Sequence, residues 1–166
     1  MGERIIIIDI SMVDISILEV AGMEQSFHML LYRAFHAQRN ALRPALGELG
    51  LGAGQPKLLG YLKRNGPCGQ RELAGYCEID PAAVSRMLES LQKGGFVTRR
   101  ADDQDKRRDL IALTPAGEGA YAAWQERCRA MEERMLAGFT PEERARFADD
   151  LGRAYRNLKA ERGEEP

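Results

Sequence analysis

Hydrophobic side chains recur every three or four residues along most of this chain, which is the period of amphipathic helices. The first such stretch runs from Met23 to about Gly47, and the four glycines within 47–54 end it. Shorter stretches with the same period follow at 56–65, 70–77 and 81–93. The pattern therefore predicts a chain built mainly from helices.

The stretch at 81–93 has clear signals at both ends. Asp80 can accept a hydrogen bond from the first turn, and Pro81 suits the first helical position because no N–H is needed there. Gly94 and Gly95 end the helix. The residues expected inside are Val84, Leu88 and Leu91 of this helix and Leu73 and Ala74 of the helix before it.

The period changes after these glycines. Residues 96–100 and 109–113 are rich in strand-forming side chains, and the eight residues between them, 101–108, are polar. This pattern predicts a β-hairpin with a polar tip.

Two further helices are expected after the hairpin. Thr114-Pro115 opens the first, and Thr140-Pro141 opens the second, where Glu143 completes a capping box. The apolar residues of the first follow a seam spacing: Tyr121, Trp124, Cys128, Met131 and Met135. Those of the second share one side: Phe147, Leu151, Ala154, Tyr155 and Leu158. We expect these helices to pack against a second copy of the chain.

The N-terminal segment alternates apolar and polar residues over 5–17, as a half-buried strand does. Asp9, Asp14 and Glu19 interrupt its apolar character, so a membrane span is not expected. Residues 1–22 form either an apolar arm that packs on a partner subunit or an upstream extension of a chain whose natural start is Met23.

Charge is balanced over the whole chain but not within it. The formal net charge is −1, which by itself indicates no polyanionic partner. Between Arg86 and Arg108, however, seven basic residues stand against four acidic ones. This local excess indicates that any nucleic-acid surface lies on the helix at 81–93 and the hairpin.

Two short helices followed by a hairpin with a cationic tip match the requirements of duplex reading. A helix fits the major groove, and a thin basic projection reaches the backbone or the minor groove. The alternative is an adaptor with the same fold that contacts proteins and does not bind DNA.

Residues 54–119 resemble the MarR family of multiple-antibiotic-resistance regulators. The resemblance rests on short motifs in a matching order: Arg71-Glu72-Leu73-Ala74, Val84-Ser85-Arg86, Leu91, Gly95-Phe96-Val97-Thr98-Arg99, Asp102-Asp103-Gln104-Asp105-Lys106-Arg107 and Leu113-Thr114-Pro115-Ala116-Gly117. It implies a mainly helical winged helix-turn-helix with a small β-hairpin wing and with N- and C-terminal dimerisation helices. The implied divisions are a dimerisation helix and linker at 23–53, a DNA-binding domain at 54–114 and dimerisation helices at 115–166.

The resemblance also implies which residues face DNA: Ala82, Ala83, Ser85, Arg86, Lys106 and Arg107. Asp105 would orient the Arg107 guanidinium. Ala82 and Ala83 depart from the family, which commonly has polar side chains there, so these two positions can offer only apolar contact, for example to a thymine methyl.

Proteins that resemble this chain commonly bind lipophilic or phenolic effectors between the dimer helices and the DNA-binding part. The residues that could line such a site here are Phe27, Tyr32, Phe35, His36 and Trp124. The resemblance therefore implies a ligand-responsive repressor that binds a palindromic operator as a homodimer.

The remaining polar residues show no catalytic set and imply no cofactor. His28 and His36 are eight residues apart, which is not the i, i+4 spacing of two metal ligands on one helix. Cys68 would be a redox sensor only if the following helix N-terminus acidified its thiol. Three cysteines without CxxC spacing, and no signal-peptide pattern, favour a cytoplasmic protein. The absence of a catalytic set favours a protein that is not an enzyme.

Overall fold

The computed structural model describes residues 26–77, 79–101 and 109–160. The chain divides into two compact units, Met1–Ala41 and Leu42–Pro166. The described part of the first unit is helical and belongs to α2 (Phe27–Glu48), apart from Ser26. The expected strand at 5–17 and both readings of residues 1–22 lie outside the described residues and stay predictions.

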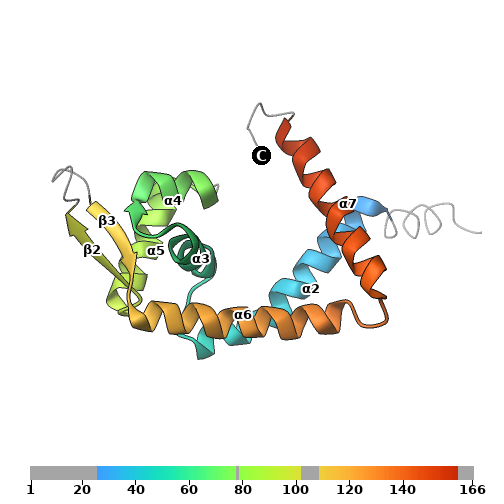
Figure 1. Ribbon diagram of the computed structural model, residues 1–166, viewed down its shortest axis with the longest axis horizontal. Coiled ribbons are helices and arrows are strands. Elements are labelled where there is room, and N and C mark those ends of the chain that lie inside the picture. Colours follow the sequence, from blue (N-terminus) through green and yellow to red (C-terminus); the bar gives the residue numbers. More distant parts are fainter. Residues whose placement is uncertain (1–25, 78, 102–108, 161–166) are drawn as a thin grey trace, which may run out of the picture. The chain divides into compact units, whose positions relative to one another are not determined.

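The second unit follows the predicted order of elements (Figure 1). After the end of α2 come the helices α3 (Gln55–Asn65), α4 (Gln70–Cys77), α5 (Pro81–Lys93), α6 (Pro115–Met135) and α7 (Pro141–Ala160), and the strands β1 (Cys68–Gly69), β2 (Val97–Ala101) and β3 (Asp109–Leu113). The helices predicted at 56–65, 70–77 and 81–93 and the two hairpin strands are confirmed within one residue at their ends.

The sheet has one strand that the sequence pattern did not predict. Its order is β1-β3-β2, and both neighbours of β3 are antiparallel to it. Cys68 pairs with Ile111, and Val97 pairs with Leu113. With only two residues, β1 is too short to show any alternation, so only the fold reveals it.

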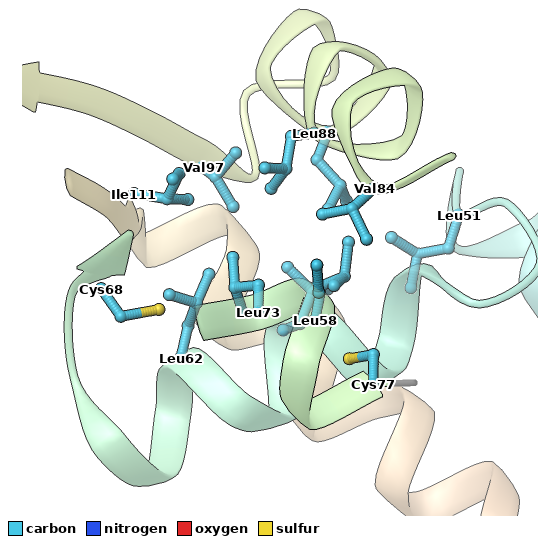
Figure 2. Close-up of a cluster of buried hydrophobic side chains, with 13 residues drawn as sticks. Leu51, Leu58, Leu62, Cys68, Leu73, Cys77, Val84, Leu88, Val97 and Ile111 are labelled. Atoms are coloured by element: carbon cyan, nitrogen blue, oxygen red, sulfur yellow. The ribbon is translucent and has the colours of Figure 1, made fainter. Parts of the chain in front are cut away.

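The core of the second unit lies between α3, α4, α5 and the sheet, as Figure 2 shows for part of it. Each of these elements contributes side chains that are almost completely buried: Leu58, Leu59, Leu73, Val84, Leu88, Leu91 and Ile111. Burying one such side chain contributes about 1.5–3 kcal/mol to folding. The inward positions predicted for α4 and α5 are confirmed.

The predicted helix starts are also confirmed. The Asp80 carboxylate accepts a hydrogen bond from the Ala83 N–H at 2.9 Å, and the Thr114 hydroxyl accepts one from the Gly117 N–H at 3.0 Å. Thr140 and Glu143 cap each other reciprocally, with distances of 2.8 and 3.2 Å. These bonds satisfy N–H groups that the first turn of a helix leaves unpaired.

The apolar seam of α6 differs from the prediction because part of it packs within the chain. Tyr121 lies against Gly60 of α3, where a Cβ would meet the Tyr121 ring at 3.0 Å or less. Met131 is buried, whereas Met135 is 45% exposed. Tyr121 therefore packs against the core of its own chain, whereas a role of the α6 seam in a dimer stays a prediction.

The helices in the described part of the chain are all too short or too polar to cross a membrane.

Candidate nucleic-acid interface

Helix α5 has one fully buried face and one exposed face. Val84, Leu88 and Leu91 hold the buried face against the core. Arg86 and Ala82 are exposed, while Ser85 and Ala83 are half-buried. Arg86 therefore points away from the core as the helical period predicts, and Ser85 lies at the margin between the two faces.

The N-terminal end of α5 is held by its own capping residue and by α4. Asp80 caps the first turn, and the Gln70 side chain donates a hydrogen bond to the Pro81 carbonyl at 3.4 Å. The apolar side of α4, which includes Leu73 and Cys77, packs into the same core. The two helices are thus fixed relative to each other at the turn that joins them.

Gln55 is a buried polar contact of α5 that sequence reasoning missed. Its side chain is only 4% exposed and bridges two backbone groups. The Gly52 N–H donates to its Oε1 at 2.7 Å, and its Nε2 donates to the Met87 carbonyl of α5 at 3.4 Å. Nothing in the sequence pattern marks Gln55, because a glutamine before Pro56 resembles an exposed helix start.

An open hollow of about 590 Å³ lies beside the exposed face of α5. The backbone of 52–54 forms one side of it, and Arg86, Met87 and Ser90 of α5 form another. Gly54 has φ +83°, a backbone conformation that favours glycine, and a Cβ there would lie 3.2 Å from the Met87 sulfur. The glycine-rich loop can therefore lie directly against α5.

The described strands of the hairpin carry two arginines of different exposure. Arg100 is exposed, whereas Arg99 is half-buried and its Nε has no hydrogen-bond partner among the described residues. Arg99 lines a second hollow, of about 460 Å³, together with Asp109 and the start of α4. The predicted wing-tip residues Asp105, Lys106 and Arg107 lie outside the described residues, so their contacts stay predictions.

Comparison with known proteins gives the same picture as this geometry. The family model described as "MarR family" matches residues 52–108. The HTH-type transcriptional regulator YwoH of Bacillus subtilis, itself uncharacterised, is 32% identical over 103 residues, which cover 62% of this chain and 74% of that protein. The chain belongs to the MarR family.

Solved structures support this membership. A MarR-family transcriptional regulator from Silicibacter pomeroyi has a TM-score of 0.68 and 30% identity, covering 81% of this chain and 91% of that one. BpsR of Bordetella bronchiseptica has a TM-score of 0.70 and 23% identity, covering 80% and 94%, so it shows the fold alone. The predicted winged helix-turn-helix fold of this MarR-family transcriptional regulator is confirmed.

The predicted effector residues of this MarR-family chain lie on two different helices. On α2, Phe27, Tyr32 and Phe35 are at least half exposed. The His36 ring is 4.3 Å from that of Tyr32 and 5.9 Å from that of Phe35, measured between centroids. Trp124 is half-buried on α6, in the other compact unit, so a pocket shared by all five residues stays a prediction.

The hypothesis that Cys68 has an acidified thiol is wrong. Cys68 is only 4% exposed, and burial raises the pKa of its thiol from 9.0 to about 11, with the Glu72 carboxylate adding to the increase. Burial also raises the pKa of the thiols of Cys77 and Cys128. In the folded chain these groups are protonated at neutral pH and poorly nucleophilic.

Within 26–77, 79–101 and 109–160 there is no group of three His, Cys, Asp or Glu side chains suited to a metal ion.

Proposed function

We propose that this MarR-family regulator binds duplex DNA as a homodimer and represses transcription from a palindromic operator. Exposed Arg86 on a helix whose opposite face is completely buried is the observation that carries the proposal. An α-helix fits the major groove, and an arginine on its outer face can reach guanine or phosphate. Arg86 has no structural role in the core that would explain it otherwise.

Four residues of α5 would face the groove in different ways. Arg86 provides a charged contact and Ser85 a hydroxyl, whereas Ala82 and Ala83 offer only small apolar surfaces. In the wing, Lys106 and Arg107 would contact the backbone or the minor groove, and Asp105 would hold the Arg107 guanidinium in place. The resemblance to the family supports these wing assignments.

Exposed apolar faces on the terminal helices support a homodimer. On α2, Phe27 is 70% exposed and Leu30 is 53% exposed. On α7, Leu151 and Leu158 are 44% and 65% exposed. Rows of exposed apolar side chains on two helices are typical of a surface that another protein covers. A second copy would also place two α5 helices about a two-fold axis, which suits a palindromic operator.

A small lipophilic or phenolic effector would modulate this binding. The solved structure of BpsR, which shares this fold, concerns the regulation of its DNA binding by 6-hydroxynicotinic acid, an aromatic acid. The Tyr32, Phe35 and His36 cluster of α2 gives this chain aromatic surface for such a ligand. Phe27 of α2 and Trp124 of α6 are the other two residues that we propose for the effector site.

The domain organisation that we propose follows from these roles. Residues 23–53 and 115–166 form the dimer layer, 54–114 form the DNA-binding domain, and 1–22 form an arm on the partner subunit. We further propose that the protein acts in the cytoplasm and has no enzymatic activity.

Selection from a random duplex pool with the purified full chain tests this function. We expect an enriched inverted repeat whose half-site centres are about one helical turn apart. Selection with the Arg86→Ala variant should give a weaker base preference at the positions nearest α5. The absence of any enrichment at low salt would contradict DNA binding and favour the protein-interaction adaptor.

A further inference from the structure

Three elements of the DNA-binding part meet at the backbone of Gly95 and Phe96. Helix α5 ends there, β2 begins there, and the first residues of α6 lie against both. The Thr114 hydroxyl donates a hydrogen bond to the Gly95 carbonyl at 2.6 Å, and the Thr114 N–H donates to the Phe96 carbonyl at 3.1 Å. Thr114 directly follows β3, so one residue connects both wing strands to the end of α5.

Gly117 brings the start of α6 against the same point. Its N–H donates to the Thr114 hydroxyl at 3.0 Å. A Cβ on Gly117 would collide with the carbonyl oxygen of Phe96, which is backbone and cannot rotate away. Gly117 is therefore required for this approach, whereas a Cβ on Gly119, two residues later, would meet nothing within 4 Å.

The Thr114 hydroxyl both accepts and donates a hydrogen bond, and the two bonds have different roles. As an acceptor it caps the first turn of α6, which many threonines before a helix do. As a donor it reaches back 19 residues to the turn between α5 and β2, which helix capping does not require. This second bond fixes the base of the wing to the turn at the end of α5.

We propose that Thr114 and Gly117 are positioning residues that hold the wing at a fixed angle to α5. The inference rests on the proposed function, because a fixed angle matters only if α5 and the wing contact one duplex together. A wing that is already oriented loses little conformational freedom on binding, whereas a freed wing must be ordered at the expense of affinity. Neither residue needs to touch DNA.

Thr114→Val and Thr114→Ser distinguish the contribution of the hydroxyl group to operator binding from that of the branched side-chain shape. Valine keeps the branched shape but loses both hydroxyl bonds, and serine keeps the hydroxyl. Each is combined with Arg107→Ala, which removes the proposed wing contact, and operator affinity is measured at a temperature where circular dichroism shows all variants folded. We expect Thr114→Val to weaken binding about tenfold and Thr114→Ser to weaken it less than about twofold.

The proposal is tested by whether the effect of Arg107→Ala on operator affinity depends on the residue at position 114. In wild type and in Thr114→Ser, Arg107→Ala should weaken binding by the same factor. In Thr114→Val the same substitution should cost less than about twofold, because the wing contact is already impaired. An undiminished effect of Arg107→Ala in the Thr114→Val background would overturn the positioning role, since a structural defect alone gives additive losses.

Gly117→Ala and Gly119→Ala form a second, independent pair. Both place alanine in the first turns of α6, where it favours the helix more than glycine does. We expect Gly117→Ala to reduce the Arg107→Ala effect as Thr114→Val does, and Gly119→Ala to leave it unchanged. Equal behaviour of the two alanine variants would contradict the inference. If Arg107→Ala does not weaken operator binding even when Thr114 and Gly117 are unchanged, the proposed wing contact is wrong. No residue is then needed to position the wing.

Discussion

Arg86 allows DNA binding and folding stability to be tested at one residue. Arg86→Ala removes an exposed side chain that lies outside the core. We expect operator affinity to fall by the equivalent of about 1–3 kcal/mol. The free energy of unfolding should change by no more than about 0.5 kcal/mol, as for most surface substitutions. Fluorescence titration with operator duplex and thermal melting measure the two quantities.

Gln92→Ala is the matched control for this substitution. Gln92 is exposed on the same helix but lies near its C-terminal end. It should leave both affinity and melting temperature almost unchanged. If Arg86→Ala lowers stability strongly and affinity only in proportion, Arg86 is a structural residue and the proposed groove contact is wrong.

Burial of Cys68 predicts a dependence of stability on pH. Below about pH 9 the thiol is protonated in both the folded and the unfolded chain. Above it the unfolded thiol ionises first, because the pKa of the folded thiol is raised to about 11. The free energy of unfolding should therefore fall between pH 9 and 11, with this thiol contributing up to about 1.4 kcal/mol per pH unit. Urea unfolding of wild type and Cys68→Ala at several pH values measures the contribution.

Cys68→Ala should show a shallower decline than wild type over this range, whatever its stability at pH 7. The buried thiol should also react with a disulfide reagent far more slowly in the folded chain than in urea. Identical pH slopes for the two proteins would show that Cys68 is not the titrating group.

Sequence reasoning was most reliable for residues whose role follows from periodicity. The inward positions of α5 and the caps Asp80, Thr114 and Thr140 depend on local spacing, so they could be predicted. Gln55 could not, because its two hydrogen-bond partners include Met87, which is 32 residues away. The effect of burial on Cys68 likewise depends on neighbours that only the fold brings together.

At the scale of elements, α7 offers the most direct test of the homodimer. Leu151→Asp would place a charge within the exposed apolar face. Burying an unpaired charge is strongly unfavourable, on the order of several kcal/mol, so the variant should be mainly monomeric and should bind a palindromic operator poorly. Sedimentation equilibrium and operator titration measure these two outcomes.

Asn157→Asp adds the same charge to α7 outside the apolar row and serves as the control. It should remain dimeric and bind the operator like wild type. A Leu151→Asp variant that sediments as an intact dimer would place the subunit interface elsewhere.

Long elements were easier to predict from the sequence than short ones. The long helices α2, α6 and α7 show several turns of periodicity, whereas β1 has two residues and was missed. For the seam of α6, the contact of Tyr121 within the chain could not be predicted, and the role of the seam in a dimer stays a prediction. Periodicity shows that Tyr121 faces apolar surroundings, but not that Gly60 of the same chain provides them.

At the scale of the whole molecule, the distribution of charge matters more for DNA binding than the net charge does. The chain carries a formal charge of −1, so general attraction to DNA cannot account for affinity. If about six phosphates are neutralised, binding should weaken on the order of a thousandfold between about 50 and 200 mM salt. Arg107→Ala should reduce the slope of log affinity against log salt by about one if this residue touches a phosphate.

Arg129→Ala is the control for this measurement, because Arg129 lies on α6 and pairs with Glu126. It should leave the slope unchanged. An equal change of slope for both variants would indicate a general charge effect and not a wing contact.

The pairing of Cys68 with Ile111 has a consequence for how the domain is made. These strands are separated by α4, α5 and the first wing strand, so the pairing closes a long stretch of chain and is entropically costly until the intervening helices have formed. During synthesis the segment around Cys68 leaves the ribosome well before its partner strand. The three-stranded sheet can therefore be completed only after β3 has emerged, when α4 and α5 have already left the ribosome.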